Sequence, residues 1–183
     1  MWLYNIAIDA MRGGIKVASA WSKKQRLWVK GRKGIFGALS RAIKPDDKVA
    51  WFHCASLGEF EQGRPVIEEL RRIRPDYKIL LTFFSPSGYE IRKDYRGADW
   101  VFYLPADTPS NARRFVQTVH PEIAVFVKYE FWLNTIDAAR RSGCRLYLIS
   151  AIFRPNQVFF KPYGGAFRRA LAAFDTLFVQ DGN

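Results

Sequence analysis

Beyond residue 45, short apolar runs alternate with segments that have helical periodicity. The apolar runs predict strands at Val49–His53, Lys78–Phe84, Trp100–Tyr103, Ile123–Val127, Arg145–Ile149 and Thr176–Val179. The segments between them predict helices near Glu59–Arg72, Gly88–Tyr95, Ser110–Val119, Phe131–Arg141 and Tyr163–Ala173. Strands that alternate with helices indicate right-handed βαβ units, so residues 46–183 are predicted to form an α/β domain around a parallel sheet.

Residues 2–28 have the pattern of a single amphipathic helix. Its polar face is predicted to carry Asn5, Asp9, Arg12, Lys16, Ser19, Lys23 and Arg26. Its apolar face is predicted to carry Leu3, Ala7, Ala10, Val17, Trp21 and Trp28. Gly13-Gly14 is expected to interrupt or kink this helix, and Lys30–Gly34 is expected to follow as a basic loop. Residues 1–45 are therefore predicted to be a separate amphipathic segment.

The positive charge of the chain is concentrated in that segment. The 183 residues include 29 Lys and Arg against 17 Asp and Glu, which gives a net charge of +12. Eleven of those basic residues, but only three Asp, lie in the first 50 residues. Such a concentration suggests an anionic partner, which could be nucleic acid, anionic lipid or a phosphorylated substrate.

Two functions are open for the amphipathic segment. Most helices of this kind pack on the domain that follows them. Tryptophans interleaved with eight basic residues between Arg12 and Lys33 also favour a helix that lies at a membrane surface. The residues expected to contact lipid are Trp21, Lys23, Lys24, Trp28, Lys30, Arg32 and Lys33. No apolar stretch is long enough to span a membrane, and no signal peptide is apparent.

The sequence offers little support for a cofactor or a metal. It contains no GxGxxG or Walker A motif, the usual signatures of dinucleotide and ATP binding. Its two cysteines, Cys54 and Cys144, and its two histidines, His53 and His120, lack the spacing of a zinc site. We interpret His53-Cys54 as the end of a strand, and we expect neither a metal nor a bound cofactor.

Candidate chemistry lies in the loops after predicted strands, because open parallel sheets bind ligands beyond the carboxyl ends of their strands. Ser56-x-x-Glu59 is a capping box, the commoner function of such a glutamate, although Glu59 could also act as a catalytic carboxylate. Glu130 could similarly interact with a helix dipole. Ser85-Pro86-Ser87-Gly88 could hold a phosphate with backbone N–H groups, although a tight turn is the commoner structure.

Taken in order, these loops resemble those of one known family. Their sequences are Ala-Ser-Leu-Gly-Glu, Thr-Phe-Phe-Ser-Pro-Ser-Gly, Tyr-Leu-Pro-Ala-Asp, Tyr-Glu-Phe-Trp and Ser-Ala-Ile-Phe-Arg. They are similar to the bacterial Kdo transferases, the 3-deoxy-manno-octulosonic acid transferases of lipopolysaccharide biosynthesis. The resemblance covers essentially the whole chain, including the basic arm Leu27–Lys33. It implies a Rossmann-like parallel sheet that forms the N-terminal, acceptor-binding domain of a GT-B glycosyltransferase.

The resemblance also implies functions for individual residues. The family's catalytic base, the glutamate of its Ser-x-Gly-Glu motif, corresponds to Glu59, and a second functional carboxylate corresponds to Glu130. Many members have Glu-x-x-Trp-Pro in the second motif, whereas this chain has Glu130-Phe131-Trp132-Leu133. The residues expected to bind the acceptor are Ser56, Gly58, Ser87, Gly88, Glu130 and Arg154.

The implied reaction is an inverting transfer of Kdo from CMP-Kdo to a lipid A precursor. One carboxylate takes the proton of the acceptor hydroxyl while the nucleotide leaves as a monophosphate, so no diphosphate-chelating metal is needed. The implied location is the cytoplasmic face of the inner membrane, where the protein would be peripheral or monotopic on an anionic surface. The chain stops just after a predicted strand. We therefore expect that a C-terminal domain, which binds most of CMP-Kdo, is absent and that this chain alone is inactive.

The residues alone leave two other classes of function possible. The basic segment is compatible with a nucleic-acid-binding module, and the sheet is compatible with a regulatory Rossmann-like module whose carboxylates only cap helices. Against nucleic acid, the basic segment carries tryptophans in an apolar stripe, and no known nucleic-acid fold pattern follows it. We therefore expect no nucleic-acid partner.

Overall fold

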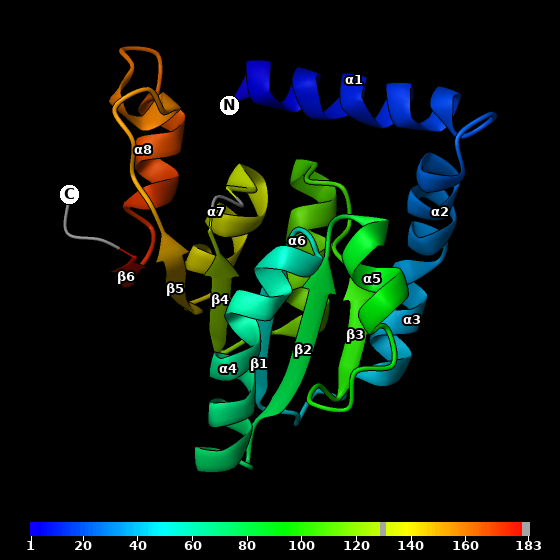
Figure 1. Ribbon diagram of the computed structural model, residues 1–183, viewed down its shortest axis with the longest axis vertical. Helices are drawn as coiled ribbons and strands as arrows, with labels where there is room; N and C mark the ends of the chain where they lie inside the picture. Colours follow the sequence, from blue (N-terminus) through cyan, green and yellow to red (C-terminus); the bar gives the residue numbers. More distant parts are fainter. Residues whose placement is uncertain (129–130, 181–183) are drawn as a thin grey trace.

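The computed structural model describes residues 1–128 and 131–180, and its centre is a six-stranded parallel sheet (Figure 1). The strands are β1 (Val49–Cys54), β2 (Lys78–Phe83), β3 (Trp100–Tyr103), β4 (Ile123–Val127), β5 (Arg145–Ala151) and β6 (Thr176–Val179). They lie in the order β3-β2-β1-β4-β5-β6, and every neighbouring pair is parallel. This is the Rossmann-like order, so the predicted fold class is confirmed, with strand ends within two residues of prediction.

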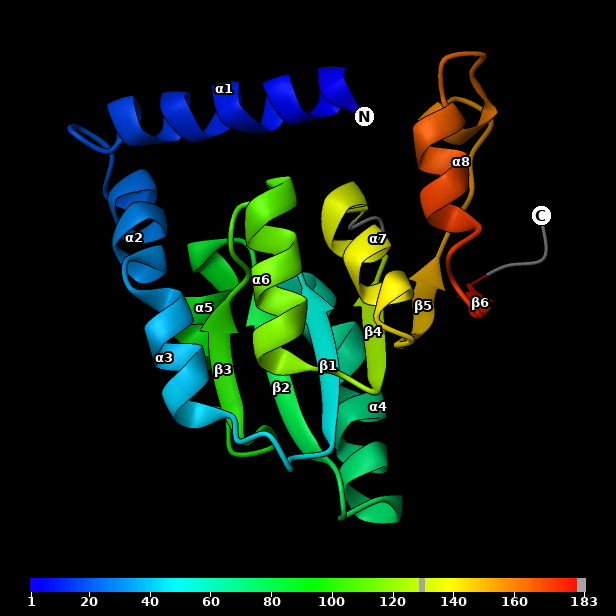
Figure 2. The ribbon, with the colours of Figure 1, turned by 180° about the vertical axis from the view of Figure 1, so that it is seen from behind.

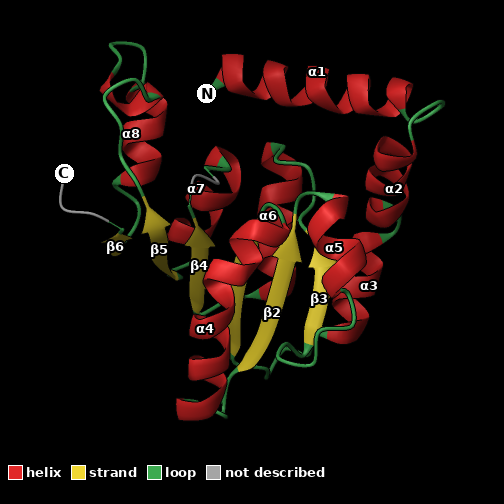
Figure 3. Cartoon of the chain, viewed as in Figure 1, coloured by secondary structure: helices red, strands yellow, loops and turns green. Residues whose placement is uncertain are grey.

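Helices cover both faces of the sheet (Figure 3). In chain order they are α1 (Trp2–Ala18), α2 (Lys23–Arg32), α3 (Ile35–Ala42), α4 (Leu57–Ile73), α5 (Pro86–Arg92), α6 (Pro109–Val119), α7 (Leu133–Arg141) and α8 (Gly165–Leu171), with a short 3-10 helix at Val158–Phe160. Helices α4 and α5 lie on one face, and α3, α6 and α7 lie on the other (Figures 1 and 2).

The double cover explains why the strands are apolar along their whole length. Alternate residues of β1 enter different cores: Trp51 packs with α6 and α7, whereas Phe52 packs with α4. All six residues of β1 are buried. Ile35 and Leu39 of α3 belong to the same core as Trp51. The boundary predicted at residue 45 therefore separates elements that share one hydrophobic core.

The N-terminal segment differs from the single helix predicted over residues 2–28. It contains three helices, and the chain turns between α1 and α2 at residues 19–22. The predicted interruption at Gly13-Gly14 is wrong, because both glycines lie inside α1. Arg26 closes the corner by donating to the backbone carbonyls of Ser19 and Ala20, at 3.2 and 3.1 Å. The predicted basic loop is also wrong in part, since residues 30–32 end α2.

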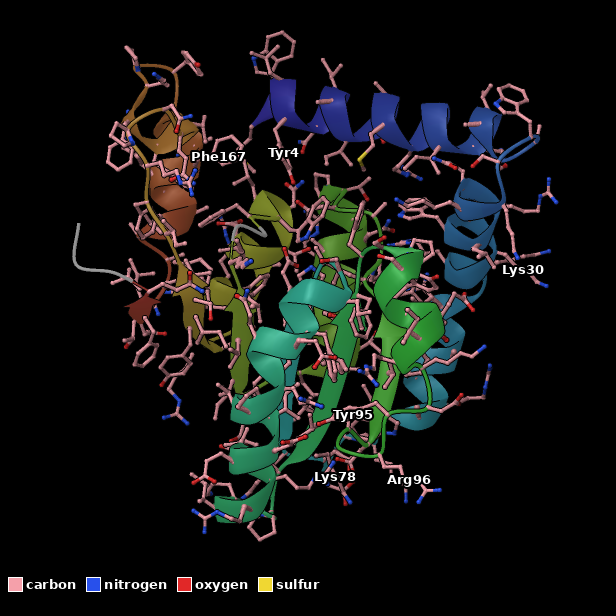
Figure 4. The ribbon with its side chains drawn as sticks, in the orientation of Figure 1. Tyr4, Lys30, Lys78, Tyr95, Arg96 and Phe167 are labelled. Atoms are coloured by element: carbon pink, nitrogen blue, oxygen red, sulfur yellow. The ribbon has the colours of Figure 1, made fainter. Side chains whose placement is uncertain are left out.

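Helix α1 crosses above the carboxyl edge of the sheet, from α7 and α8 at one end to α2 at the other (Figures 1 and 2). Its inner face packs on the domain: Ile8 is buried, and Tyr4 makes an edge-to-face contact with Phe167 of α8. Figure 4 shows Tyr4 pointing from α1 toward the rest of the fold. Leu3 and Val17 of the predicted apolar face are 65% and 63% exposed. Helix α1 thus packs on the domain through one face and exposes apolar residues on another.

Candidate active site

The sheet order reverses between β1 and β4, so the loops after these two strands flank the point where such folds bind ligands. The loop after β1 leads into α4 through the predicted capping box. The Glu59 carboxylate accepts the backbone N–H of Ser56 at 3.2 Å and that of Ala55 in a shorter bond. Glu59 is half-buried. The local structure expected from Ser56-x-x-Glu59 is therefore confirmed, and it holds the carboxylate at the carboxyl edge of the sheet.

The loop after β2 forms the first turn of α5 instead of the tight turn that the sequence favours. Ser85 is the N-cap, its hydroxyl accepts the backbone N–H of Ser87 at 3.3 Å, and Pro86 begins the helix. Ser87 is exposed, whereas Gly88 is buried. A Cβ on Gly88 would lie 2.3 Å from the ring of Phe83 and 3.1 Å from the backbone of Ser56. Gly88 therefore allows the two loops to pack together. Because Phe83 and Ser56 lie against it, Gly88 does not face a ligand.

His53 links the centre of the sheet to the loop after β4. The indole N–H of Trp132 donates to His53 Nε2 at 2.9 Å, so Nε2 accepts and the ring proton lies on Nδ1. His53 Nδ1 is 2.9 Å from Thr82 Oγ1, which also accepts the indole N–H of Trp51 at 2.8 Å. The interpretation of His53 as only a strand end was incomplete, because this buried side chain fixes the position of Trp132.

Glu130 lies outside the described residues, but the backbone beside it is unusual. Lys128 follows β4 with φ of 62°, and Ser150 near the end of β5 has φ of 57°. This left-handed region costs a non-glycine residue roughly 1–2 kcal/mol. The backbone N–H of Lys128 donates to the carbonyl of Ile149 at 2.9 Å, which joins the ends of the two strands. Arg154, farther along the chain after β5, is exposed.

Asp107, in the loop after β3, connects α1 to α7. It is 1% exposed and accepts the Tyr4 hydroxyl at 2.6 Å and the backbone N–H groups of Asn134 and Thr135 at 3.0 and 2.8 Å. The Thr135 hydroxyl donates to it as well. Burial raises the pKa of Asp107, and these hydrogen bonds act against that rise. The carboxylate therefore serves as the shared acceptor where three parts of the chain meet.

The model of a family described as 3-deoxy-D-manno-octulosonic-acid transferase (kdotransferase) matches residues 29–183. The chain belongs to the Kdo transferase family. Its match is to the N-terminal domain of these glycosyltransferases, which confirms the resemblance seen in the loop sequences.

Kdo transferases from several organisms align with about half of this chain or more. The 3-deoxy-D-manno-octulosonic acid transferase of Chlamydia muridarum is 29% identical over 153 residues, covering 80% of this chain and 35% of that protein. The transferase of Bordetella pertussis is 30% identical over 161 residues, covering 84% and 37%. The transferase of Aquifex aeolicus is 38% identical over 87 residues, covering 47% and 24%. The aligned part of the chain thus spans about a quarter to a third of the length of these relatives.

Of the residues expected to contact lipid, Trp28 is buried and Arg32 is half-buried in this Kdo transferase domain. Trp28 is 8% exposed and packs edge-to-face on Phe84. The Arg32 guanidinium lies over the rings of Trp28 and Tyr103 and donates to the carbonyls of Leu104 and Phe84, at 2.8 and 2.9 Å. Burial lowers its pKa to about 9. Both predictions of lipid contact are therefore corrected, because these side chains attach α2 to the loops after β2 and β3.

The other expected lipid contacts are on the surface. Trp21 is 73% exposed, and Lys23, Lys24, Lys30 and Lys33 are exposed as well. In the part of the chain that the structure describes, no helix combines the length and the apolar character needed to cross a bilayer. Within the same residues, no group of three or more His, Cys, Asp or Glu side chains is arranged to hold a metal.

Proposed function

We propose that this chain is the acceptor-binding half of a Kdo transferase that performs an inverting transfer of Kdo from CMP-Kdo to a lipid A precursor. The observation that carries the proposal is the position of Glu59. It follows β1 directly, at the switch point of a Rossmann-like sheet that belongs to the Kdo transferase family. A half-buried carboxylate there, held by two backbone N–H groups, is oriented to take a proton from an acceptor hydroxyl.

The acceptor is proposed to lie on the loops around Glu59. Gly58 is exposed, and a Cβ there would meet no atom within 4 Å, so a ligand can approach its backbone. Ser56 and Ser87 offer polar groups on adjacent loops, and Arg154 offers a cation suited to a phosphate. Glu130 is kept as a further acceptor-binding candidate from the sequence motif. Gly88 is proposed to contribute only by bringing the two loops together.

The whole protein should transfer Kdo from CMP-Kdo to a lipid A precursor, whereas residues 1–183 alone should not. The reason is that the chain spans only 35% of the Chlamydia muridarum relative, so most of the donor site is proposed to lie outside it. Mass spectrometry of the lipid product measures transfer, and NMR of the new linkage tests inversion. Turnover by residues 1–183 well above background would contradict the proposal that most of the donor site lies outside them. A retained anomeric configuration would contradict the inverting mechanism.

We further propose that α1 attaches the protein peripherally to the cytoplasmic face of the inner membrane. Leu3, Ile6 and Val17 form an exposed apolar stripe along the side of α1 that is not packed on the domain, and Trp2 and Trp21 lie at its two ends. Exposed lysines on α2 follow directly. An apolar stripe with flanking tryptophans and lysines is the pattern of an interfacial helix.

Replacing Leu3, Val17 and Trp21 together by Ser should greatly weaken sedimentation with vesicles of phosphatidylcholine and phosphatidylglycerol. The substitutions remove apolar surface that would be buried in the interface and leave the docked face of α1 unchanged. The control replaces three exposed apolar residues on α4 and α5, Val66, Ile73 and Ile91, by Ser. Equal loss of binding by both variants, or tighter binding of the wild type to an oligonucleotide than to vesicles, would refute the attachment.

A further inference from the structure

An aromatic pair lies across the carboxyl end of β1. Trp132 follows β4 and Phe84 follows β2, yet their ring centroids are 4.4 Å apart, with the ring planes inclined by 31°. Because β1 lies between β2 and β4 in the sheet, this contact crosses the end of β1, where the loop that carries Glu59 begins. The pair therefore lies at the switch point of the sheet. Neither residue is among those proposed to bind the acceptor.

The loop of Glu59 is joined directly to this pair. The backbone N–H of Ala55 donates to the Glu59 carboxylate, and the carbonyl of Ala55 accepts the backbone N–H of Ser85 at 2.8 Å. Ser85 follows Phe84 in the chain. Two hydrogen bonds through one residue thus connect the proposed catalytic base to the loop that carries Phe84, and a ligand on the aromatic pair lies beside that base.

Trp132 is held from inside the sheet. Its indole N–H donates to Nε2 of His53 at 2.9 Å, and Nδ1 of His53 is 2.9 Å from Oγ1 of Thr82. His53 and Thr82 are fully buried and belong to β1 and β2, so the acceptor of the indole N–H has a fixed position. The one polar atom of the Trp132 side chain is therefore satisfied. Trp132 and Phe84 are each half-buried, and what their side chains offer to a ligand is apolar ring surface.

Phe84 also lines a cavity of about 250 Å³ between α1, α2 and the loop after β2. Its large apolar walls are Ile15, Trp28 and Phe84, and its hydrogen-bonding groups are Lys24, Gln25 and Ser85. Pockets for drug-sized ligands measure roughly 300–1,000 Å³, so this smaller volume suits a single ring. Aromatic walls beside a few hydrogen-bonding groups are a common lining for small polar molecules that have an apolar face.

We propose that Trp132 and Phe84 form the platform on which a sugar ring of the acceptor stacks, and that His53 positions Trp132 for this contact. A sugar ring presents C–H groups on its faces, which pack on aromatic rings, and hydroxyls around its edge, which need hydrogen-bonding groups. The inference rests on the proposed function. It deepens that function by assigning this surface to the sugar of the lipid A precursor, as distinct from its phosphates and acyl chains.

Trp132→Leu in the whole protein should raise the KM for the lipid A precursor about tenfold, a typical effect of losing one aromatic contact. The KM for CMP-Kdo should not change, because the platform touches only the acceptor. The matched control is Trp100→Leu, which removes a half-buried tryptophan at the amino end of the edge strand β3 and should change neither KM. An acceptor KM of Trp132→Leu equal to that of the control would overturn the platform.

Two His53 variants test the positioning. His53→Gln keeps an acceptor oxygen near the position of Nε2 and should keep the acceptor KM close to that of the wild type. His53→Leu has no acceptor and should raise this KM toward that of Trp132→Leu. In a Trp132→Phe background, which lacks the indole N–H, the two His53 variants should have the same acceptor KM. A His53 side chain that only stabilises the fold would lower the amount of active protein and leave the acceptor KM unchanged, and that result would refute positioning.

A spectroscopic test does not depend on transfer. In whole protein labelled with 5-fluorotryptophan, the Trp132 fluorine resonance is assigned by its loss in Trp132→Phe. Deacylated lipid A precursor should shift this resonance, and should still shift it after its phosphates are removed, because stacking needs only the sugar ring. The Trp100 resonance should not move. A response that requires the phosphates, or no response of Trp132, would overturn the platform. A Trp132 shift in a protein that does not transfer Kdo would support the platform and contradict only the catalytic proposal.

Discussion

Glu59→Gln in the full-length protein should lower the rate of Kdo transfer by about 10²–10⁴-fold, the usual contribution of a general base. An amide cannot accept the proton of the acceptor hydroxyl. It can still accept the backbone N–H groups of Ala55 and Ser56, because capping boxes tolerate Gln at this position. The fold should therefore keep its stability while the activity is lost.

Initial rates and thermal unfolding measured on one preparation separate the two functions of Glu59. Glu69→Gln is the matched control, since it makes the same chemical change on an exposed residue of the same helix. It should leave the rate unchanged. A Glu59→Gln enzyme that retains more than a tenth of the wild-type rate would show that Glu59 is only a helix cap.

Asp107→Asn should destabilise the fold by about 3 kcal/mol. The carboxylate uses both oxygens, one for Tyr4 and Asn134 and the other for Thr135. An asparagine has only one acceptor oxygen. Its NH₂ group must therefore face the donors on one side, either Tyr4 and Asn134 or Thr135, and these donors lose their acceptor. Each buried donor left without an acceptor costs about 1–3 kcal/mol. Urea unfolding at pH 7 measures the change, which should appear in the transition midpoint with an unchanged slope.

Two further variants show which contact is responsible. Asp137→Asn makes the same change on an exposed residue of α7 that pairs with Arg141, and it should cost less than about 0.5 kcal/mol. Tyr4→Phe removes the hydroxyl that donates to Asp107 and accepts the backbone N–H of Leu133, and it should cost about 1 kcal/mol. If Asp107→Asn costs no more than Asp137→Asn, the shared acceptor is not important to stability.

The strands could be predicted because burial on both faces makes each of them a short apolar run bounded by turn residues. The helix start at Ser56 could be predicted for a similar reason, since Ser56 and Glu59 are partners only three residues apart. Both features depend on neighbours along the chain. Local patterns of this kind can be recognised in the sequence because they do not depend on contacts that form only in the folded protein.

The break in the N-terminal segment was predicted at the wrong place for an energetic reason. A helical glycine costs only about 1 kcal/mol, and docking of Tyr4 and Ile8 on the domain favours a continuous α1 through Gly13-Gly14. The true start of α2 follows Ser22-x-x-Gln25, which has the spacing of a capping box. That local signal could have indicated the second helix.

The contacts of His53, Arg32 and Asp107 could not be predicted from the sequence. Trp132 is 79 residues from His53, and the carbonyls that bind Arg32 are 52 and 72 residues away from it. An arginine in a basic segment is usually on the surface, and no local pattern shows that aromatic rings will enclose this one. Such partners are determined only when the strands take their order in the sheet.

The position of α1 above the carboxyl edge of the sheet would determine how the domain is oriented on a membrane and how far that edge lies from it. Its axis runs across the ends of the strands, so a membrane touching its outer stripe would lie roughly perpendicular to the sheet (Figure 1). The edge that carries Glu59 would then face the bilayer, with α1 between them. A sugar hydroxyl on a lipid headgroup could be reached at that height while the acyl chains stay in the membrane. If the proposed attachment is right, α1 would act as a spacer, and the whole protein would reach its acceptor without extracting it from the membrane.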